Sequence, residues 1–292
     1  MITFIPSANS TSVSILVGNI LHVVKNVHIP QEYFEYDFRT FGLQIEASCV
    51  MWSSQNCFCR FSNELNAYQL FDRRGNFLSE GKYALSACRY KSITFIAVSE
   101  GGKIVIYYGD GTTITPIFNL DVSAVYKMHC VSEKEVVITT NNGCYHAEFL
   151  QSEIDEIEPL WHVESIDSLD NTATIRSLLT RTLNDRKYWI CVTPKEISIF
   201  LKTLKVRSIE MKSVIRNAVV CGDDVFCLLD SGKVMRKSLS TKNADRFTLD
   251  HITANDIAIL NNFIFISDIV NGKVVVFNNS MIKLGSIKVT HS

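Results

Sequence analysis

Residues 225–239 read VFCLLDSGKVMRKSL, and residues 263–277 read FIFISDIVNGKVVVF. In both stretches a β-rich apolar run stops at a polar turn ending in Gly-Lys, and a second strand-like run follows. Branched and aromatic residues favour strands, whereas Asp, Ser, Asn and Gly favour the tight turn between them. Each stretch therefore predicts a β-hairpin, and the two hairpins lie about forty residues apart, which is typical of a repeat fold.

Similar turns recur along the whole chain at intervals of about forty residues. They lie at Gly18-Asn19, Asn63-Glu64, Gly101-Gly102, Asn142-Gly143, Pro194-Lys195, Ser231-Gly232 and Asn271-Gly272. Each of these seven units has an apolar run before the hairpin and a looser run after it. Four short antiparallel strands per unit are typical of the blade of a β-propeller. We therefore predict an all-β chain in which residues 1–292 form a single seven-bladed β-propeller of four-stranded antiparallel blades. A pair of β-sandwiches is the alternative architecture, but it would not require seven evenly spaced turns.

The strand patterns also predict how a blade is covered. The continuous apolar runs VVITT (136–140) and FIFIS (263–267) indicate strands that are covered on both faces. Closure of the ring has two alternatives. Either every blade is built from contiguous sequence, or the N-terminal segment pairs into the last blade.

The order of strand, polar bend, strand, DSG, NNG or EGG turn and strand resembles the unit of WD-repeat propellers, and GDGT at 109–112 resembles its turn. The Gly-His and Trp-Asp dipeptides of that family are absent, so its polar tetrad is not transferred to any residue here. LLDSGKV (228–234) and AVSEGGKI (97–104) show a weaker similarity to regulator-of-chromosome-condensation propellers, which are richer in glycine than this chain with 13. Both resemblances imply the propeller fold.

Composition and motifs narrow the class of protein. The chain has 292 residues, 47% of them hydrophobic and 20% charged, which is enough to bury a large core. No secretory signal, membrane-spanning run, G-x-S-x-G elbow, H-E-x-x-H pair or Walker loop is present. Nine cysteines without a signal indicate reduced thiols and a cytoplasmic or nuclear location. We expect no enzyme activity, no cofactor and no catalytic site.

Two pairs of Cys and His side chains are candidate metal ligands. Cys57 and Cys59, and likewise Cys144 and His146, have the spacing of a strand rather than that of a turn that wraps a metal ion. We expect these thiols to pack between blades, and we expect no metal site.

Charge is distributed unevenly although the formal net charge is only −1. An acidic insertion around 151–173 carries the candidate partner-binding residues Glu153, Asp155, Glu156 and Glu158. Basic residues follow in excess between 202 and 246. The candidate basic patch consists of Lys202, Lys205, Arg207, Arg236, Lys237, Lys242 and Arg246. Such a patch could contact phosphate or an acidic protein if its members share one rim of the disc.

These observations predict a non-catalytic propeller that serves as a protein–protein interaction scaffold or as an accessory subunit of a multiprotein complex. The predicted partners are proteins, with RNA contact through the basic patch as a further possibility, and neither a membrane nor a small-molecule cofactor. One alternative is an accessory subunit that helps an RNA- or tRNA-modifying enzyme to hold its substrate. Another, implied by the weaker resemblance to regulator-of-chromosome-condensation propellers, is a guanine-nucleotide exchange or chromatin-binding propeller. The scaffold prediction rests on analogy with other propellers, whose fold is commonly used for binding.

Overall fold

The structure is a computed structural model, and its described part is built of strands, with no α-helix among the described residues. The described residues are 2–5, 12–17, 20–28, 35–42, 49–53, 57–62, 67–72, 77–82, 84–90, 93–109, 114–150, 160–167, 169, 174–241 and 244–289. In that part of the chain, no helix is long and apolar enough to cross a membrane.

The strands of the described residues form seven four-stranded sheets, each an antiparallel meander in sequence order, which we call blades 1 to 7. Blade 1 contains β1 (Ile2–Ile5), β2 (Ser12–Val17), β3 (Ile20–His28) and β4 (Glu35–Gly42). Blade 2 contains β5 (Cys49–Ser53), β6 (Cys57–Ser62), β7 (Ala67–Asp72) and β8 (Phe77–Lys82). Blade 3 contains β9 (Ala84–Tyr90), β10 (Ile93–Glu100), β11 (Lys103–Gly109) and β12 (Ile114–Leu120).

The second half of the ring follows the same plan. Blade 4 contains β13 (Val125–Ser132), β14 (Glu135–Thr140), β15 (Gly143–Leu150) and β16 (Leu160–Ser165). Blade 5 contains β17 (Ser177–Leu183), β18 (Arg186–Val192), β19 (Glu196–Leu201) and β20 (Leu204–Glu210). Blade 6 contains β21 (Ile215–Cys221), β22 (Asp224–Leu229), β23 (Val234–Ser238) and β24 (Ala244–Phe247). Blade 7 contains β25 (Ala254–Leu260), β26 (Phe263–Asp268), β27 (Lys273–Phe277) and β28 (Lys283–Lys288).

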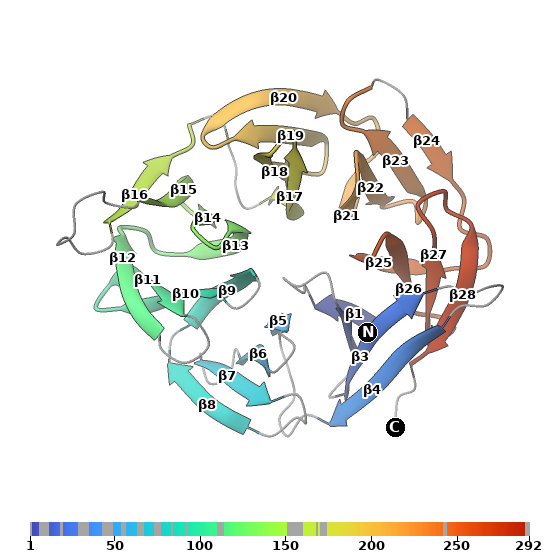
Figure 1. The fold of residues 1–292 in the computed structure, drawn as a ribbon, viewed down its shortest axis with the longest axis horizontal. Helices are drawn as coiled ribbons and strands as arrows, with labels where there is room; N and C mark the ends of the chain where they lie inside the picture. The colour runs from blue at the N-terminus through green and yellow to red at the C-terminus, as the bar shows by residue number, and fades with distance from the viewer. Residues whose placement is uncertain are drawn as a thin grey trace.

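The blades are arranged around a central axis (Figure 1). The first strand of each blade lies nearest the axis, and the fourth strand lies at the circumference. The predicted all-β propeller is confirmed, and the predicted hairpins lie where the opening stretches place them, between β22 and β23 and between β26 and β27.

Turn chemistry explains why the strands reverse at these points. After β22 the chain turns through Asp230, Ser231 and Gly232, and the Gly232 amide donates to the carbonyl of Leu229 at 2.9 Å. Gly232 has a φ of +76°, a left-handed conformation that glycine adopts without steric cost. The Leu229 amide then donates to the carbonyl of Lys233 at 2.9 Å and starts the next strand pair.

The second strand of a blade is its most buried element. In β14, β22 and β26 every residue after the first is buried. Each of these strands lies inside its sheet and is covered by the adjacent blades on both faces, as the continuous apolar runs predict. Burying a Val, Ile or Phe side chain stabilises the fold by about 1.5–3 kcal/mol, so these strands anchor each blade.

The ring closes by packing of blade 1 against blade 7. β1 pairs with β2 inside its own sheet, and the last sheet contains only β25 to β28, so each of these blades is contiguous in sequence. One apolar cluster, the closing seam, nevertheless joins the two ends of the chain. Its buried members are Ile2, Phe4, Val13, Ile15, Val17, Val24, Val27, Leu260, Phe265, Val274, Val276, Ile287 and Val289.

A chain of hydrogen bonds runs beside the closing seam along the first strands of blades 5, 6, 7 and 1. Ser177 Oγ donates to Asn217 Oδ1 at 2.6 Å, and Asn217 Nδ2 donates to Asp256 Oδ1. The Phe4 amide of β1 donates to Asp256 Oδ2 at 3.0 Å. Burial raises the pKa of the Asp256 carboxyl, while the bonds from Phe4 and Asn217 act in the opposite direction. Asp256 is therefore the polar link between the two ends of the chain.

We predict that replacing Phe265 by Ala destabilises the ring by about 3–5 kcal/mol, because the side chain is fully buried in the closing seam. Val270 in the same blade is 72% exposed, so Val270→Ala should change the free energy of unfolding by less than about 0.5 kcal/mol. Urea unfolding of both variants measures the difference. Equal stabilities would contradict closure by packing of blade 1 on blade 7.

Candidate functional site

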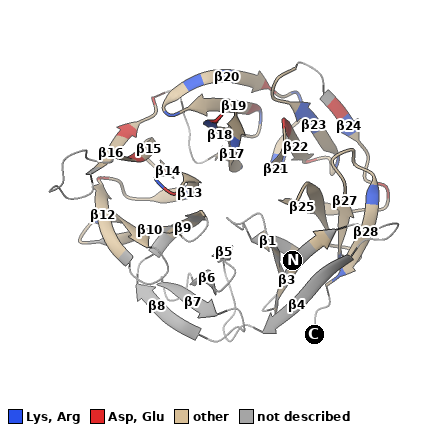
Figure 2. Ribbon diagram, viewed as in Figure 1, with Lys and Arg blue, Asp and Glu red and all other residues tan. Residues whose placement is uncertain are grey.

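The predicted basic patch falls on the outer half of blades 5 and 6 (Figure 2). Lys202 lies in the turn between β19 and β20, Lys205 and Arg207 lie on β20, Arg236 and Lys237 on β23, and Arg246 on β24. Because adjacent strands are antiparallel, the turns after the first and third strands of every blade lie on one face of the ring. We call it the Lys202 face; it includes the turns β17–β18, β19–β20, β21–β22 and β23–β24.

Lys202 links blade 5 to blade 4. Its Nζ lies 2.8 Å from Glu148 Oε2 on β15, and this hydrogen bond raises the pKa of Lys202. The indole Nε1 of the buried Trp189 donates to the Lys202 carbonyl at 2.7 Å, which fixes the turn. Lys202 has a φ of +51°, so the backbone of this turn is held in a left-handed conformation.

Lys205 is paired within blade 5. Its Nζ lies 2.6 Å from Glu196 Oε1, which also accepts hydrogen bonds from Ser198 Oγ and Ser208 Oγ, each at 2.6 Å. These three hydrogen bonds, with that of Lys205 the largest contribution, lower the pKa of Glu196 to about 2. The charge of Lys205 is therefore matched by a carboxylate of its own blade.

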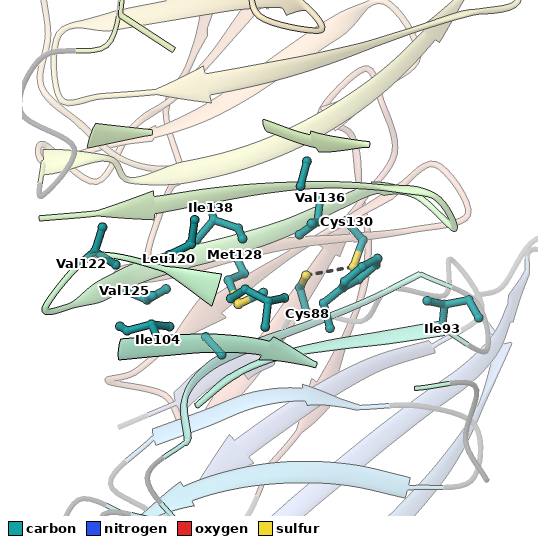
Figure 3. Packing of buried hydrophobic residues seen from close by; sticks show 14 residues of the cluster. Cys88, Ile93, Ile104, Leu120, Val122, Val125, Met128, Cys130, Val136 and Ile138 are labelled. Carbon is teal, nitrogen blue, oxygen red and sulfur yellow. Dashed lines mark hydrogen bonds between the residues drawn. The ribbon is translucent and has the colours of Figure 1, made fainter. Parts of the chain in front are cut away.

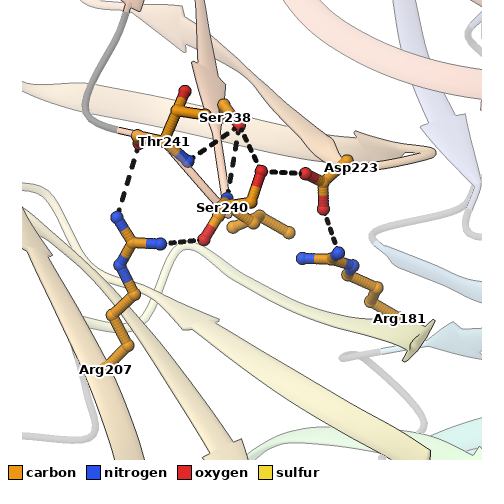
Figure 4. A network of polar contacts seen from close by, with 7 residues as sticks. Arg181, Arg207, Asp223, Ser238, Ser240 and Thr241 are labelled. Carbon is orange, nitrogen blue, oxygen red and sulfur yellow. Dashed lines mark hydrogen bonds and ion pairs between the residues drawn. The ribbon is translucent and has the colours of Figure 1, made fainter. Parts of the chain in front are cut away.

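Arg207 and a second arginine, Arg181, connect blade 5 to blade 6 on the Lys202 face (Figure 4). The Arg207 guanidinium donates to the carbonyl of Leu239 and, at 3.4 Å, to that of Thr241. Arg181, on β17, forms an ion pair with Asp223 in the turn β21–β22. Asp223 also accepts a hydrogen bond from Ser240 Oγ, so the two turns of blade 6 are held together.

The other predicted cations differ in their surroundings. Arg236 forms an ion pair with Asp245 on the neighbouring strand and lies 5.9 Å from the ring centroid of Phe247. Lys237 is half-buried on β23, and Arg246 is exposed on β24. Lys242 lies outside the described residues. Lys202, Lys205, Arg207 and Arg236 thus have acceptors within the protein, which reduces the charge that this surface offers to phosphate.

The four predicted acidic residues Glu153, Asp155, Glu156 and Glu158 also lie outside the described residues. The strands on either side are described. Leu150 at the end of β15 pairs with Leu160 at the start of β16, so these two strand ends lie side by side on the Lys202 face. Residues 160–165 of the predicted insertion form β16, the fourth strand of this blade. The acidic stretch therefore begins, at Glu153, five residues after Glu148, the partner of Lys202.

Three apolar side chains are exposed beside these charges. The distribution of charge in the sequence did not predict them. Leu204 is 65% exposed and Val206 45% exposed on β20, and Leu150 is 41% exposed on β15. Leu150 follows Glu148 by two residues on β15, so these two side chains point to the same side of that strand. Leu204 is the first residue of β20, directly after the turn that contains Lys202. We call Leu150, Leu204 and Val206 the rim surface. The alternation in LKVRSIE of β20 is the sequence feature that could have revealed it.

The cysteine and histidine side chains of this part of the ring lie in packed positions between blades. Among the described residues, no group of three or more His, Cys, Asp and Glu side chains is placed to hold a metal ion. Cys144 and Cys191 are buried in the apolar cluster between blades 4 and 5, and burial raises the pKa of Cys191 to about 12. His129 is half-buried on β13, where its Nε2 contacts Thr180 Oγ1 of blade 5, and desolvation lowers its pKa to about 4. These groups serve the packing between blades.

We predict that Arg207→Ala destabilises the protein by about 1.5–3 kcal/mol, since two carbonyls of blade 6 lose a charged donor. Arg246→Ala serves as the matched control. Arg246 is exposed, so its loss should change the free energy of unfolding by less than about 0.5 kcal/mol. Chemical denaturation of the two variants checks this; an effect of Arg246→Ala as large as that of Arg207→Ala would argue against an inter-blade role for Arg207.

Glu196 gives a prediction for pH dependence. Its pKa in the folded chain, about 2, is lower than the 4.5 of an unperturbed glutamate. The ionised carboxylate therefore stabilises the fold above about pH 4.5, and this contribution disappears as the pH falls toward 2. Glu196→Gln should be less stable than the wild type at pH 7, and the difference should vanish near pH 2. Urea unfolding across this range measures it, and a difference that does not depend on pH would exclude the assigned role.

The chain is similar to known proteins in its fold and not in its sequence. No protein-family model matches the chain, and no curated protein matches its sequence. Among solved structures, Kluyveromyces lactis Hsv2 is similar with a TM-score of 0.65 and 10% identity, over 99% of this chain and 100% of that chain. Saccharomyces cerevisiae Sqt1 is similar with a TM-score of 0.60 and 13% identity, over 98% of this chain and 84% of that chain.

A third similar structure is the Swd1 β-propeller domain of Myceliophthora thermophila. It has a TM-score of 0.53 and 9% identity, over 84% of this chain and 90% of that chain. At these identities the comparisons show the fold alone. The chain has the fold of a WD-repeat-like β-propeller, as the pattern of strands and turns predicts.

Proposed function

We propose that this propeller is a non-catalytic scaffold, or an accessory subunit of a multiprotein complex, that binds a protein partner in the cytoplasm or nucleus. The observation that carries the proposal is the rim surface, where apolar side chains are exposed beside charges that are already paired. Interfaces between proteins commonly place apolar anchors at their centre and paired polar groups around them. The similarity to propellers such as the Swd1 domain is consistent with a binding role.

The charges of the surrounding surface support a protein partner over a nucleic acid. Binding of RNA or DNA depends on cations that can neutralise phosphates. Lys202, Lys205 and Arg207 have acceptors inside the protein, and using them for phosphate would cost those contacts. A protein partner can bury Leu204 and Val206 without breaking any of these pairs. The acidic stretch at 153–158 is the proposed second contact of that partner.

The test is affinity purification of the full chain from its native cells with quantitative mass spectrometry. Leu204→Asp combined with Val206→Asp should reduce recovery of a stoichiometric protein partner by at least about tenfold, because loss of an apolar anchor costs 2 kcal/mol or more. Ile282→Asp is the control, since Ile282 is 61% exposed on blade 7. Melting temperatures of all variants confirm that the ring is intact.

Two outcomes would contradict the proposal. One is a wild-type sample that contains no stoichiometric protein. The other is a partner retained equally by the double variant and by Ile282→Asp. Recovery of RNA that is lost on Arg246→Glu would instead support the RNA-binding alternative, because Arg246 is exposed and its reversal breaks none of the inter-blade contacts described above.

A further inference from the structure

Two cysteine sulfurs meet between blades 3 and 4. Cys88 lies on β9 and Cys130 on β13, which are the first strands of their blades. The two Sγ atoms are 2.9 Å apart, and both thiols are free (Figure 3). Cys88 is 8% exposed and Cys130 5% exposed, so the pair lies inside the interface between blades 3 and 4 rather than on the surface.

Packing between blades 3 and 4 holds the two sulfurs close to bonding distance. A disulfide has an S–S length of about 2.05 Å, so the sulfurs would need to approach by roughly 0.9 Å. Phe95, Met128 and Val136 belong to the same buried cluster and limit the rotation of both side chains. Because cores are close-packed, this arrangement persists in the folded ring and holds the thiols at a high effective concentration.

The other described cysteines are arranged differently. Cys144 and Cys191 share the cluster between blades 4 and 5, where Cys191 adds to the effect of burial in raising the pKa of Cys144. Cys221 donates to Asn262 Oδ1 at 3.5 Å, and Cys227 lies in the separate cluster between blades 5 and 6. Among the described cysteines, the direct contact of the Cys88 and Cys130 sulfurs therefore distinguishes this pair by geometry and not merely by burial.

We propose that Cys88 and Cys130 are a modification site at which a peroxide forms a disulfide that covalently joins blades 3 and 4. One thiol attacks the peroxide, the O–O bond breaks, and a sulfenic acid and one water are formed. The second thiol attacks the sulfenic sulfur, the S–S bond forms, the S–O bond breaks, and a second water leaves with the remaining proton. Two electrons pass from the thiol pair to the peroxide.

The environment makes this modification selective rather than fast. Burial, followed by the contact with Cys88, raises the pKa of the Cys130 thiol, so the reactive thiolate is scarce at neutral pH. A small peroxide can reach the interface between blades 3 and 4 during local opening, whereas a bulky disulfide such as oxidised glutathione is excluded from the packed core. Oxidation of the native ring should therefore be slow with oxidised glutathione and faster with hydrogen peroxide.

The cross-link would change the mechanics of the ring. The two residues are 42 positions apart, so the bond would close a loop that contains most of blade 3. Closing such a loop restricts the unfolded chain and should raise the melting temperature of the full protein by about 5 °C. It would also prevent blades 3 and 4 from separating, which packing alone permits.

The experiment uses the purified, reduced full chain treated with hydrogen peroxide and then with an alkylating agent. Mass spectrometry of the unreduced digest should show the peptide pair joined through Cys88 and Cys130 in the wild type and in Cys227→Ser. The pair should be absent in Cys88→Ser and in Cys130→Ser. Recovery of both residues as separate alkylated thiols or as higher oxides, at a dose that oxidises other cysteines, would overturn the proposal.

A second measurement removes the dependence on access to this interface. Reduced, unfolded protein is refolded in a glutathione redox buffer, and all disulfides in the folded product are quantified. The Cys88–Cys130 bond should exceed any other pair by at least about tenfold, because the folded interface brings these sulfurs together. A product in which this bond is no more abundant than other pairs would overturn the proposal even if the serine variants fail to fold.

Discussion

The packing of blade 1 against blade 7 is the contact on which the rest of the structure depends. A single blade has two apolar faces and cannot cover both, so every blade needs two neighbours, and only a closed ring provides them. The first and last blades are each contiguous in sequence, so among the described strands no shared sheet ties the two ends together. Closure rests on the buried side chains of the closing seam and on the Asp256 carboxylate, which accepts the Phe4 amide.

In the closed ring, several surface charges form contacts between blades. Lys202 and Arg207 contribute to the excess of positive charge in residues 202–246, yet in the ring they hold blade 5 to blades 4 and 6. An isolated surface ion pair is worth little, but these contacts couple blades that are already packed. The surface proposed to bind a partner is then defined by exposed apolar residues such as Leu204. The proposed scaffold role depends on this division between charges used inside the ring and side chains left outside it.

Much of the fold could be predicted from the sequence, and the particular elements show why. The run FIFIS and the turn at Gly272 identify β26 and its hairpin because local pattern decides burial and turn type. The contacts between blades could not be predicted in this way. Nothing local connects Cys88 with Cys130 or Phe4 with Asp256, since each pair is joined only by the radial stacking of distant segments. For the same reason the positive excess could be counted in the sequence, but its internal acceptors could not be assigned.

Hydrogen exchange at β1 tests the central claim, closure through the seam, most directly. The measurement compares amide protection of the peptide covering residues 2–17 in the wild type and in Asp256→Ala. If closure depends on the seam and on the Asp256 link, β1 is protected in the wild type and loses protection in the variant, while β14 in blade 4 is unchanged. A wild-type β1 that exchanges as fast as an unfolded peptide, or equal protection of β1 in both proteins, would contradict this account of how the ring closes.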